Sequence, residues 1–145
     1  MTTARAYDGL GKINLALGKL QVAYQFHESA LRIKEYNMGK RHASTLFSMS
    51  NVASVLIQLH DYNKAMKILD TIFQIQDERL LEPNGQTISN LVDVGNTLQK
   101  IGRVLFFMEK VDDGIRSYHQ ALAHYKAAGL DDSDVRVATL LQALK

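Results

Sequence analysis

The side chains best suited to chemistry are five histidines, and their spacing argues against a shared metal. They are His27, His42, His60, His119 and His124. The closest pair, His119 and His124, would lie about 140° apart around a helix. A metal site needs its ligands to converge on one point. We therefore expect no metal and no cofactor.

Two acidic clusters, Asp112-Asp113 and Asp131-Asp132-Ser133-Asp134, are the other candidates for chemistry. Each precedes an expected helix, where negative charge interacts favourably with the positive end of the helix dipole. The chain also lacks a phosphate-binding Walker loop, a Gly-x-Ser-x-Gly nucleophile turn and a His-Glu-x-x-His metal motif. We therefore expect that the chain is not an enzyme.

Charge and composition restrict the partners only weakly. The 145 residues carry a formal net charge of +2, which is too small to favour nucleic acid or a membrane surface. Residues 1–44 hold seven basic and three acidic residues, which we interpret as a solvated surface. The alternative is that Arg32, Lys34, Lys40 and Arg41 favour an acidic partner or nucleic acid. We expect a protein or peptide as the partner and no membrane span.

The remaining composition points to an intracellular helical protein. No cysteine is present, so thiol chemistry and disulfides are excluded. Residues 1–5 lack the apolar core of a signal peptide, and we expect the cytoplasm or another intracellular compartment. The only proline is Pro83, which leaves long runs free to be helical. We expect an all-α fold with helices at about residues 3–18, 20–36, 43–59, 62–82, 87–109, 112–128 and 134–144.

The sequence aligns with itself three times. A large apolar residue precedes a small one at Leu10-Gly11, Val52-Ala53 and Ile101-Gly102. Seven places after each small residue comes a polar break, and small residues return on the second helix as Ala23, Ala65 and Gly114. Small residues at matched positions let two helices approach closely, so each segment predicts a helical hairpin. Apolar residues between them recur at helical spacing and are expected to form the core, beginning with Leu10, Ile13, Leu17 and Leu20.

This pattern resembles the tetratricopeptide repeat (TPR). The phrase Ser50-Asn51-Val52-Ala53 is similar to the Asn-Leu-Ala helix of kinesin-light-chain-type TPRs. The resemblance implies one TPR domain over residues 1–145, a right-handed α-solenoid. Its repeats would span about residues 3–36, 43–82 and 87–128, followed by a capping helix at about 134–144. That last helix could equally be the first helix of a fourth repeat.

The resemblance also implies a function and a site. TPR proteins act as non-catalytic scaffolds, and the first helices line a concave groove that holds a peptide or a helix. The groove-facing positions here would be Asp8, Lys12, Leu15, Ser50, Asn51, Ser54, Ile57, Gln99, Lys100, Arg103 and Phe106. Asn51 matches the asparagine that holds a peptide backbone in TPRs of this kind; the alternative is a polar residue that simply faces solvent. The alternatives are a structural subunit of a larger complex and a regulatory TPR fragment of a longer protein.

Two finer expectations follow from the alignment with TPRs. The clamp that grips terminal carboxylates in chaperone-binding TPRs would fall on Asp8, Lys12, Asn51, Asn96 and Lys100. Asp8 would repel such a carboxylate, so we do not expect chaperone-tail binding. His27 falls where the repeat favours an aromatic ring between helices, and Tyr118 takes the matching place in the third repeat. At the longer second joint, Leu80 and Leu81 are expected either to pack near Leu91 or to form an exposed contact patch.

Overall fold

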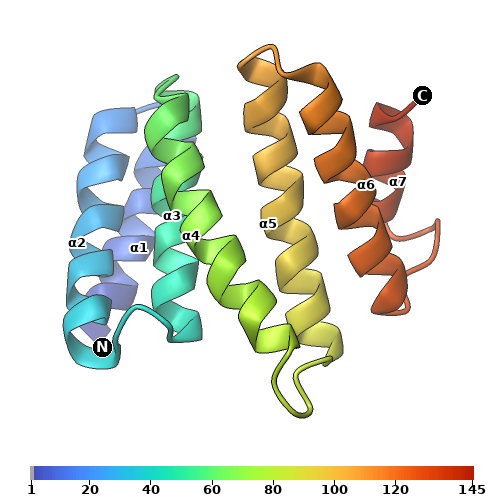
Figure 1. The fold of residues 1–145 in the computed structure, drawn as a ribbon. Helices are drawn as coiled ribbons and strands as arrows, with labels where there is room; N and C mark the ends of the chain where they lie inside the picture. The colour runs from blue at the N-terminus through green and yellow to red at the C-terminus, as the bar shows by residue number, and fades with distance from the viewer. Residues whose placement is uncertain (1) are drawn as a thin grey trace. The chain divides into compact units, whose positions relative to one another are not determined.

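The fold is all-α. The computed structural model describes residues 2–145, with side chains from Thr3 onward, and every regular element in that range is a helix. All seven expected helices are confirmed, and each end lies within two residues of the expected one. In chain order they are α1 (Thr2–Ala16), α2 (Leu20–Met38), α3 (Ala43–Gln58), α4 (Tyr62–Leu80), α5 (Ile88–Phe107), α6 (Val111–Ala127) and α7 (Val135–Ala143) (Figure 1).

Polar side chains lie at the start of several helices. The Lys64 amide lies 3.4 Å from Asp61 Oδ1 at the start of α4, as expected of a capping aspartate. In α6, Lys110 occupies the N-cap position and Asp112 lies in the first turn. In α7, Asp134 is the N-cap residue and accepts a hydrogen bond from the Arg136 amide at 2.9 Å.

The turn inside each hairpin has the same backbone conformation in all three repeats. Gly18, His60 and Glu109 each lie seven residues after the small residue of the first helix, and their φ angles are 76°, 62° and 62°. This left-handed conformation suits glycine but costs energy for other residues. Its recurrence at one repeat position supports the alignment independently of the apolar pattern.

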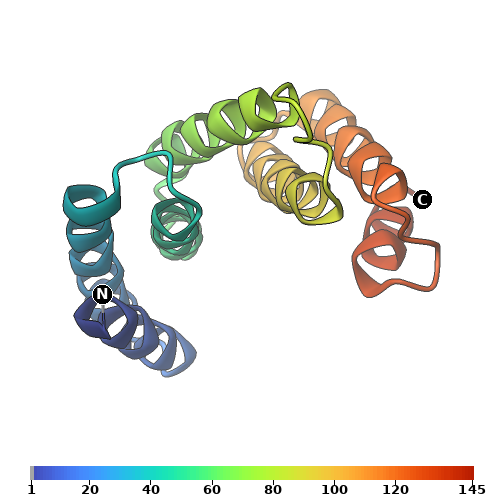
Figure 2. The ribbon, with the colours of Figure 1, turned by 90° about the horizontal axis from the view of Figure 1, so that it is seen from below.

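The chain divides into two compact units, Met1–Ile72 and Phe73–Lys145, with the boundary inside α4. In unit 1, α1 packs against α2, and α2 packs against α3 (Figures 1 and 2). Gly11 makes the first contact possible, because a Cβ there would lie 2.6 Å from the His27 ring. His27 is buried between the helices, as expected.

Unit 2 repeats this arrangement with α5, α6 and α7. A Cβ on Gly102 would lie 2.5 Å from the Tyr118 ring, which matches the Gly11–His27 contact one hairpin earlier. The core of the unit also contains Leu80, which clusters with Leu91, whereas Leu81 next to it is exposed. The buried members of this core are Leu80, Leu91, Val94, Leu98, Tyr118, Ala121, Tyr125, Ala128, Val137 and Leu140.

The first apolar stripe does not form core, contrary to the expectation. Leu10, Ile13 and Leu17 are 41%, 58% and 65% exposed, and only Leu20 is partly covered. Their counterparts on α3, Val52 and Val55, are at most 2% exposed. Helix α2 packs against α3, whereas none of the described helices precedes α1.

Candidate functional site

Unit 1 contains a buried network of polar side chains centred on the carboxylate of Asp8, a residue expected to face the groove. Asp8 is 5% exposed. Its Oδ1 lies 2.8 Å from His27 Nδ1, and its Oδ2 accepts hydrogen bonds from Lys34 Nζ at 3.0 Å and from the Ser48 hydroxyl at 2.7 Å. Asn51 Nδ2 lies 3.5 Å from Oδ1. The side chain therefore joins α1, α2 and α3.

These partners keep Asp8 ionised despite its burial. Burial by itself would raise the pKa of the Asp8 carboxyl. Hydrogen bonds from His27, Ser48 and Lys34, together with the Lys34 charge, lower that pKa well below its usual range. Lys34 is 3% exposed and also donates to the Ser44 carbonyl at 3.2 Å. A buried pair of this kind satisfies both charges inside the protein.

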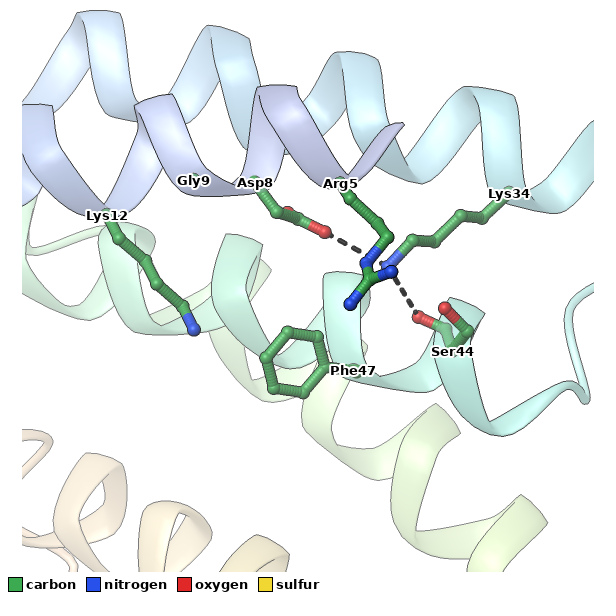
Figure 3. A pocket seen from close by; sticks show the side chains of 7 residues that line it. All are labelled: Arg5, Asp8, Gly9, Lys12, Lys34, Ser44 and Phe47. Atoms are coloured by element: carbon green, nitrogen blue, oxygen red, sulfur yellow. Dashed lines mark hydrogen bonds and ion pairs between the residues drawn. The ribbon is translucent and has the colours of Figure 1, made fainter. Parts of the chain in front are cut away.

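A pocket of about 350 Å³ lies against this ion pair. Figure 3 shows Arg5 and Lys12 extending from α1 on either side of the Phe47 ring, which projects from α3. Lys12 Nζ lies 4.9 Å and Lys34 Nζ lies 5.5 Å from the centroid of that ring, within the range of cation–π attraction. The seven lining residues are Arg5, Asp8, Gly9, Lys12, Lys34, Ser44 and Phe47.

The other groove candidates of unit 1 lie on α1 and α3 at different depths. Lys12 is exposed, whereas Leu15, Ser50, Asn51 and Ser54 are partly covered and Ile57 is buried. The Ser54 hydroxyl donates to the Ser50 carbonyl at 3.0 Å, one turn earlier in α3. Of the positions expected in this unit, Asp8 and Lys12 line the pocket. Ile57 contributes packing area rather than an open surface.

The candidates of unit 2 all lie on α5. Gln99, Lys100 and Phe106 are partly covered, and Arg103 is exposed. The Tyr125 hydroxyl of α6 lies 2.6 Å from Asn96 Oδ1 and 3.3 Å from Gln99 Oε1, and burial raises the pKa of Tyr125 to about 12. Burial and the nearby Arg103 charge lower the pKa of Lys100. Lys100 and Arg103 make this surface cationic. The contacts of Asn96 and Gln99 with Tyr125 connect it to α6.

Phe106 packs inside its own hairpin. Its ring meets that of Tyr118 edge-on, with centroids 5.0 Å apart. A Cβ on Gly114 would lie 3.0 Å from the Phe106 ring, which explains why glycine replaces the alanine of the other repeats. The aromatic face that Phe106 could offer to a ligand is therefore partly occupied.

Sequence reasoning missed four residues of the pocket as binding residues: Arg5, Gly9, Ser44 and Phe47. Lys34 was considered only as one of the basic residues within residues 1–44. Because it is buried, it does not belong to a solvated surface. A signal existed for two of these. Arg5, Phe47 and Asn96 each lie six residues before the small residue of their first helix, so they share one repeat position. Asn96 is one of the five clamp positions that the TPR resemblance implied.

Among residues 2–145, no three acidic or histidine side chains come together where they could hold a metal ion. No helix in that range has both the length and the apolar character needed to cross a lipid bilayer.

Similar structures define the fold. The chain matches BtubC (BKLC) from P. vanneervenii with a TM-score of 0.78 and 17% identity, over 97% of this chain and 53% of that one. It matches a chain named as a kinesin light chain, with nearly identical TPR-like repeats, from Podosopora anserina. That TM-score is 0.80 at 18% identity, over 97% of this chain and 63% of the other. No protein-family model and no curated protein matches the sequence.

These matches show that the protein has a TPR-like helical-repeat fold, as the resemblance in the sequence implied. The chain spans between about half and two thirds of the length of the solved chains that it matches. At 17–18% identity the likeness extends to the fold alone, so the partner has to be argued from the residues of this chain.

Proposed function

We propose that the protein is a non-catalytic interaction module that binds a peptide or a helix of another protein along its first helices. The pocket of unit 1 is the observation that carries this proposal. It opens between α1 and α3, and two of its lining residues, Asp8 and Lys12, are positions implied by the TPR resemblance. The exposed cations and the aromatic ring of the pocket, together with the partly covered Asn51 that lies 3.5 Å from Asp8, suit an extended chain, whose backbone and side chains need both polar bonds and apolar contact.

The proposal predicts which substitutions weaken binding. A peptide that binds the chain can be selected from a display library, and its affinity can be measured by titration calorimetry. Asn51→Ala and Lys12→Ala should each weaken binding of that peptide by about 1–3 kcal/mol, because each removes a hydrogen-bonding group from the first-helix surface of unit 1. Thermal stability should change by less than about 0.5 kcal/mol for the exposed Lys12.

Lys67 and Arg116 provide matched controls. Both are exposed basic residues on second helices, α4 and α6. Lys67→Ala and Arg116→Ala should leave the affinity unchanged. If these two changes abolish binding while the first-helix changes do not, the ligand lies on the second helices and the proposal is wrong.

A second candidate function is a structural subunit of a larger complex. The exposed stripe of Leu10, Ile13 and Leu17 on α1 favours it. Helix α2 packs against α3, and Val52 and Val55 of the corresponding α3 stripe are buried, so an amphipathic helix of another subunit would cover the α1 stripe in a similar way.

This candidate predicts that the isolated chain self-associates through the α1 stripe. Light scattering across a dilution series should show oligomers, and Ile13→Lys with Leu17→Lys should restore a monomer. Substituting the exposed Val135 of α7 with lysine should have no such effect. A chain that is monomeric throughout, and unaffected by the α1 changes, favours the peptide-binding module instead.

A further inference from the structure

The pocket of unit 1 holds more positive charge than its own carboxylate can neutralise. Both oxygens of Asp8 are already bonded, Oδ2 to Lys34 and Ser48 and Oδ1 to His27. Asp8 is the only acidic residue among the seven that line the pocket. The pocket lining therefore offers Arg5 and Lys12 no carboxylate oxygen that is not already bonded, and both side chains are exposed.

The net charge of the lining selects between possible anions. Arg5, Lys12 and Lys34 contribute three positive charges and Asp8 one negative charge, which leaves an excess of two. A phosphate monoester carries about −1.5 to −2 at neutral pH, whereas a carboxylate carries only one negative charge. The phosphate monoester is therefore the closer electrostatic match.

The geometry of the lining suits the same group. Arginine presents planar N–H donors that bind phosphate oxygens in pairs, and lysine adds a point charge. Ser44 lines the pocket from the first turn of α3, where the helix dipole favours an anion. Phe47 supplies an apolar wall, and its contact with Lys12 holds that ammonium group beside the opening.

We propose that this pocket is a receptor for a phosphate monoester, carried by a phosphorylated side chain of the partner peptide. The inference rests on the proposed function for the identity of the partner, but binding of the phosphoryl group itself can be measured separately. Arg5 and Lys12 bind the phosphoryl oxygens. Lys34 and Asp8 form the fixed floor, and Asp8 holds the Lys34 ammonium in place.

The test uses N-acetyl-phosphoserine amide and ¹⁵N-labelled full-length chain in NMR titrations. The amide signals of Gly9, Ser44 and Phe47 should shift and saturate. Arg5→Gln and Lys12→Gln should each weaken the binding by about tenfold, which corresponds to about 1.4 kcal/mol. Lys67→Gln removes an equal charge from an exposed residue of unit 1 outside the pocket lining and should leave the binding unchanged. Circular dichroism should show that all three variants remain folded.

N-acetyl-glutamate amide serves as the comparison ligand and should bind at least about threefold more weakly than the phosphoserine amide, because it carries about one charge fewer. Equal binding of the two would overturn the proposal in favour of a carboxylate pocket. Shifts that do not saturate, or that Lys67→Gln weakens as much as Lys12→Gln, would show only diffuse anion attraction and would also overturn it.

A competition experiment separates this inference from the proposed function. Displacement of the display-selected peptide by the phosphoserine amide supports both. Saturable binding of the phosphoserine amide without displacement supports the pocket, but contradicts a peptide site at this place. Binding of the selected peptide without any binding of the phosphoserine amide overturns the inference alone.

Discussion

Replacing Asp8 with asparagine should lower the free energy of unfolding by about 3–5 kcal/mol, because it leaves the buried Lys34 ammonium without a counter-charge. Lys34 is 3% exposed and cannot turn to solvent without leaving its bonds to Asp8 and Ser44. Asparagine keeps the shape of aspartate, so the loss would report charge rather than packing. Urea unfolding at neutral pH measures it.

A surface ion pair provides the matched control. Asp113 bonds to Arg116 at the start of α6, where both side chains are more than half exposed. Asp113→Asn should cost at most about 1 kcal/mol, because water solvates the remaining charge. If the two substitutions have equal effects, the Asp8–Lys34 pair is not buried in solution.

The loss should also depend on pH in a definite direction. The pKa of Asp8 is lower in the folded protein than in the unfolded chain, so the folded state favours the ionised form. The stabilisation is complete above the unfolded pKa of about 3.9 and is lost as the pH falls through the folded pKa. The difference between wild type and Asp8→Asn should therefore narrow as the pH falls below about 3.9.

Removing the buried Lys34 ammonium should restore stability to the Asp8→Asn variant. Lys34→Met keeps an unbranched side chain of similar length without charge. The Asp8→Asn, Lys34→Met double variant should recover much of the stability that Asp8→Asn loses, because no buried charge is left. If it recovers none, the cost of Asp8→Asn arises from the bonds to His27 and Ser48.

Local pattern was enough to predict the helices and their pairing. The step of sixteen residues from Gly11 to His27 recurs from Gly102 to Tyr118, and in both cases the small residue receives the ring. Such contacts depend on residues within one hairpin, so the spacing of small and large side chains encodes them. The left-handed turns at His60 and Glu109 fall in the same register.

The polar site could not be predicted in the same way, because the repeat determines which positions meet but not the chemistry of the side chains that meet there. Asp8 and Lys34 are 26 residues apart, and so are Gln99 and Tyr125, whose side chains also meet. Each pair joins the same two repeat positions, but with different chemistry. Asp8 was therefore interpreted as a surface charge that repels anions, whereas the structure shows it neutralised within the protein.

The exposed stripe of α1 marks a second limit of sequence reasoning. Leu10 and Ile13 have the spacing of core residues, and their counterparts in the next two hairpins are core. Periodicity indicates which side of a helix is apolar. Whether that side is covered depends on a neighbouring helix, which the pattern of a single helix does not reveal.

Deleting residues 133–145 should destabilise unit 2 by about 3–6 kcal/mol, because the deletion removes two fully buried side chains and uncovers their partners. Val137 and Leu140 of α7 are 0% exposed, and they cluster with Tyr125 and Leu91. Burial of one valine or leucine side chain is worth about 1.5–3 kcal/mol. Chemical denaturation followed by circular dichroism would show the loss as a lower midpoint.

Point substitutions within α7 distinguish the stability contributed by its buried side chains from that contributed by the helix itself. Leu140→Ala should cost about 2–5 kcal/mol, because it leaves a cavity between α7 and α6. Val135→Ala removes a similar apolar group from a side chain that is 78% exposed, so it should change stability by less than about 0.5 kcal/mol. Equal effects of the two substitutions, or a deletion variant that unfolds like the parent, would mean that α7 does not cover the third hairpin. A selective effect of Leu140 would instead show that α7 closes the core of unit 2 through the side that faces α6.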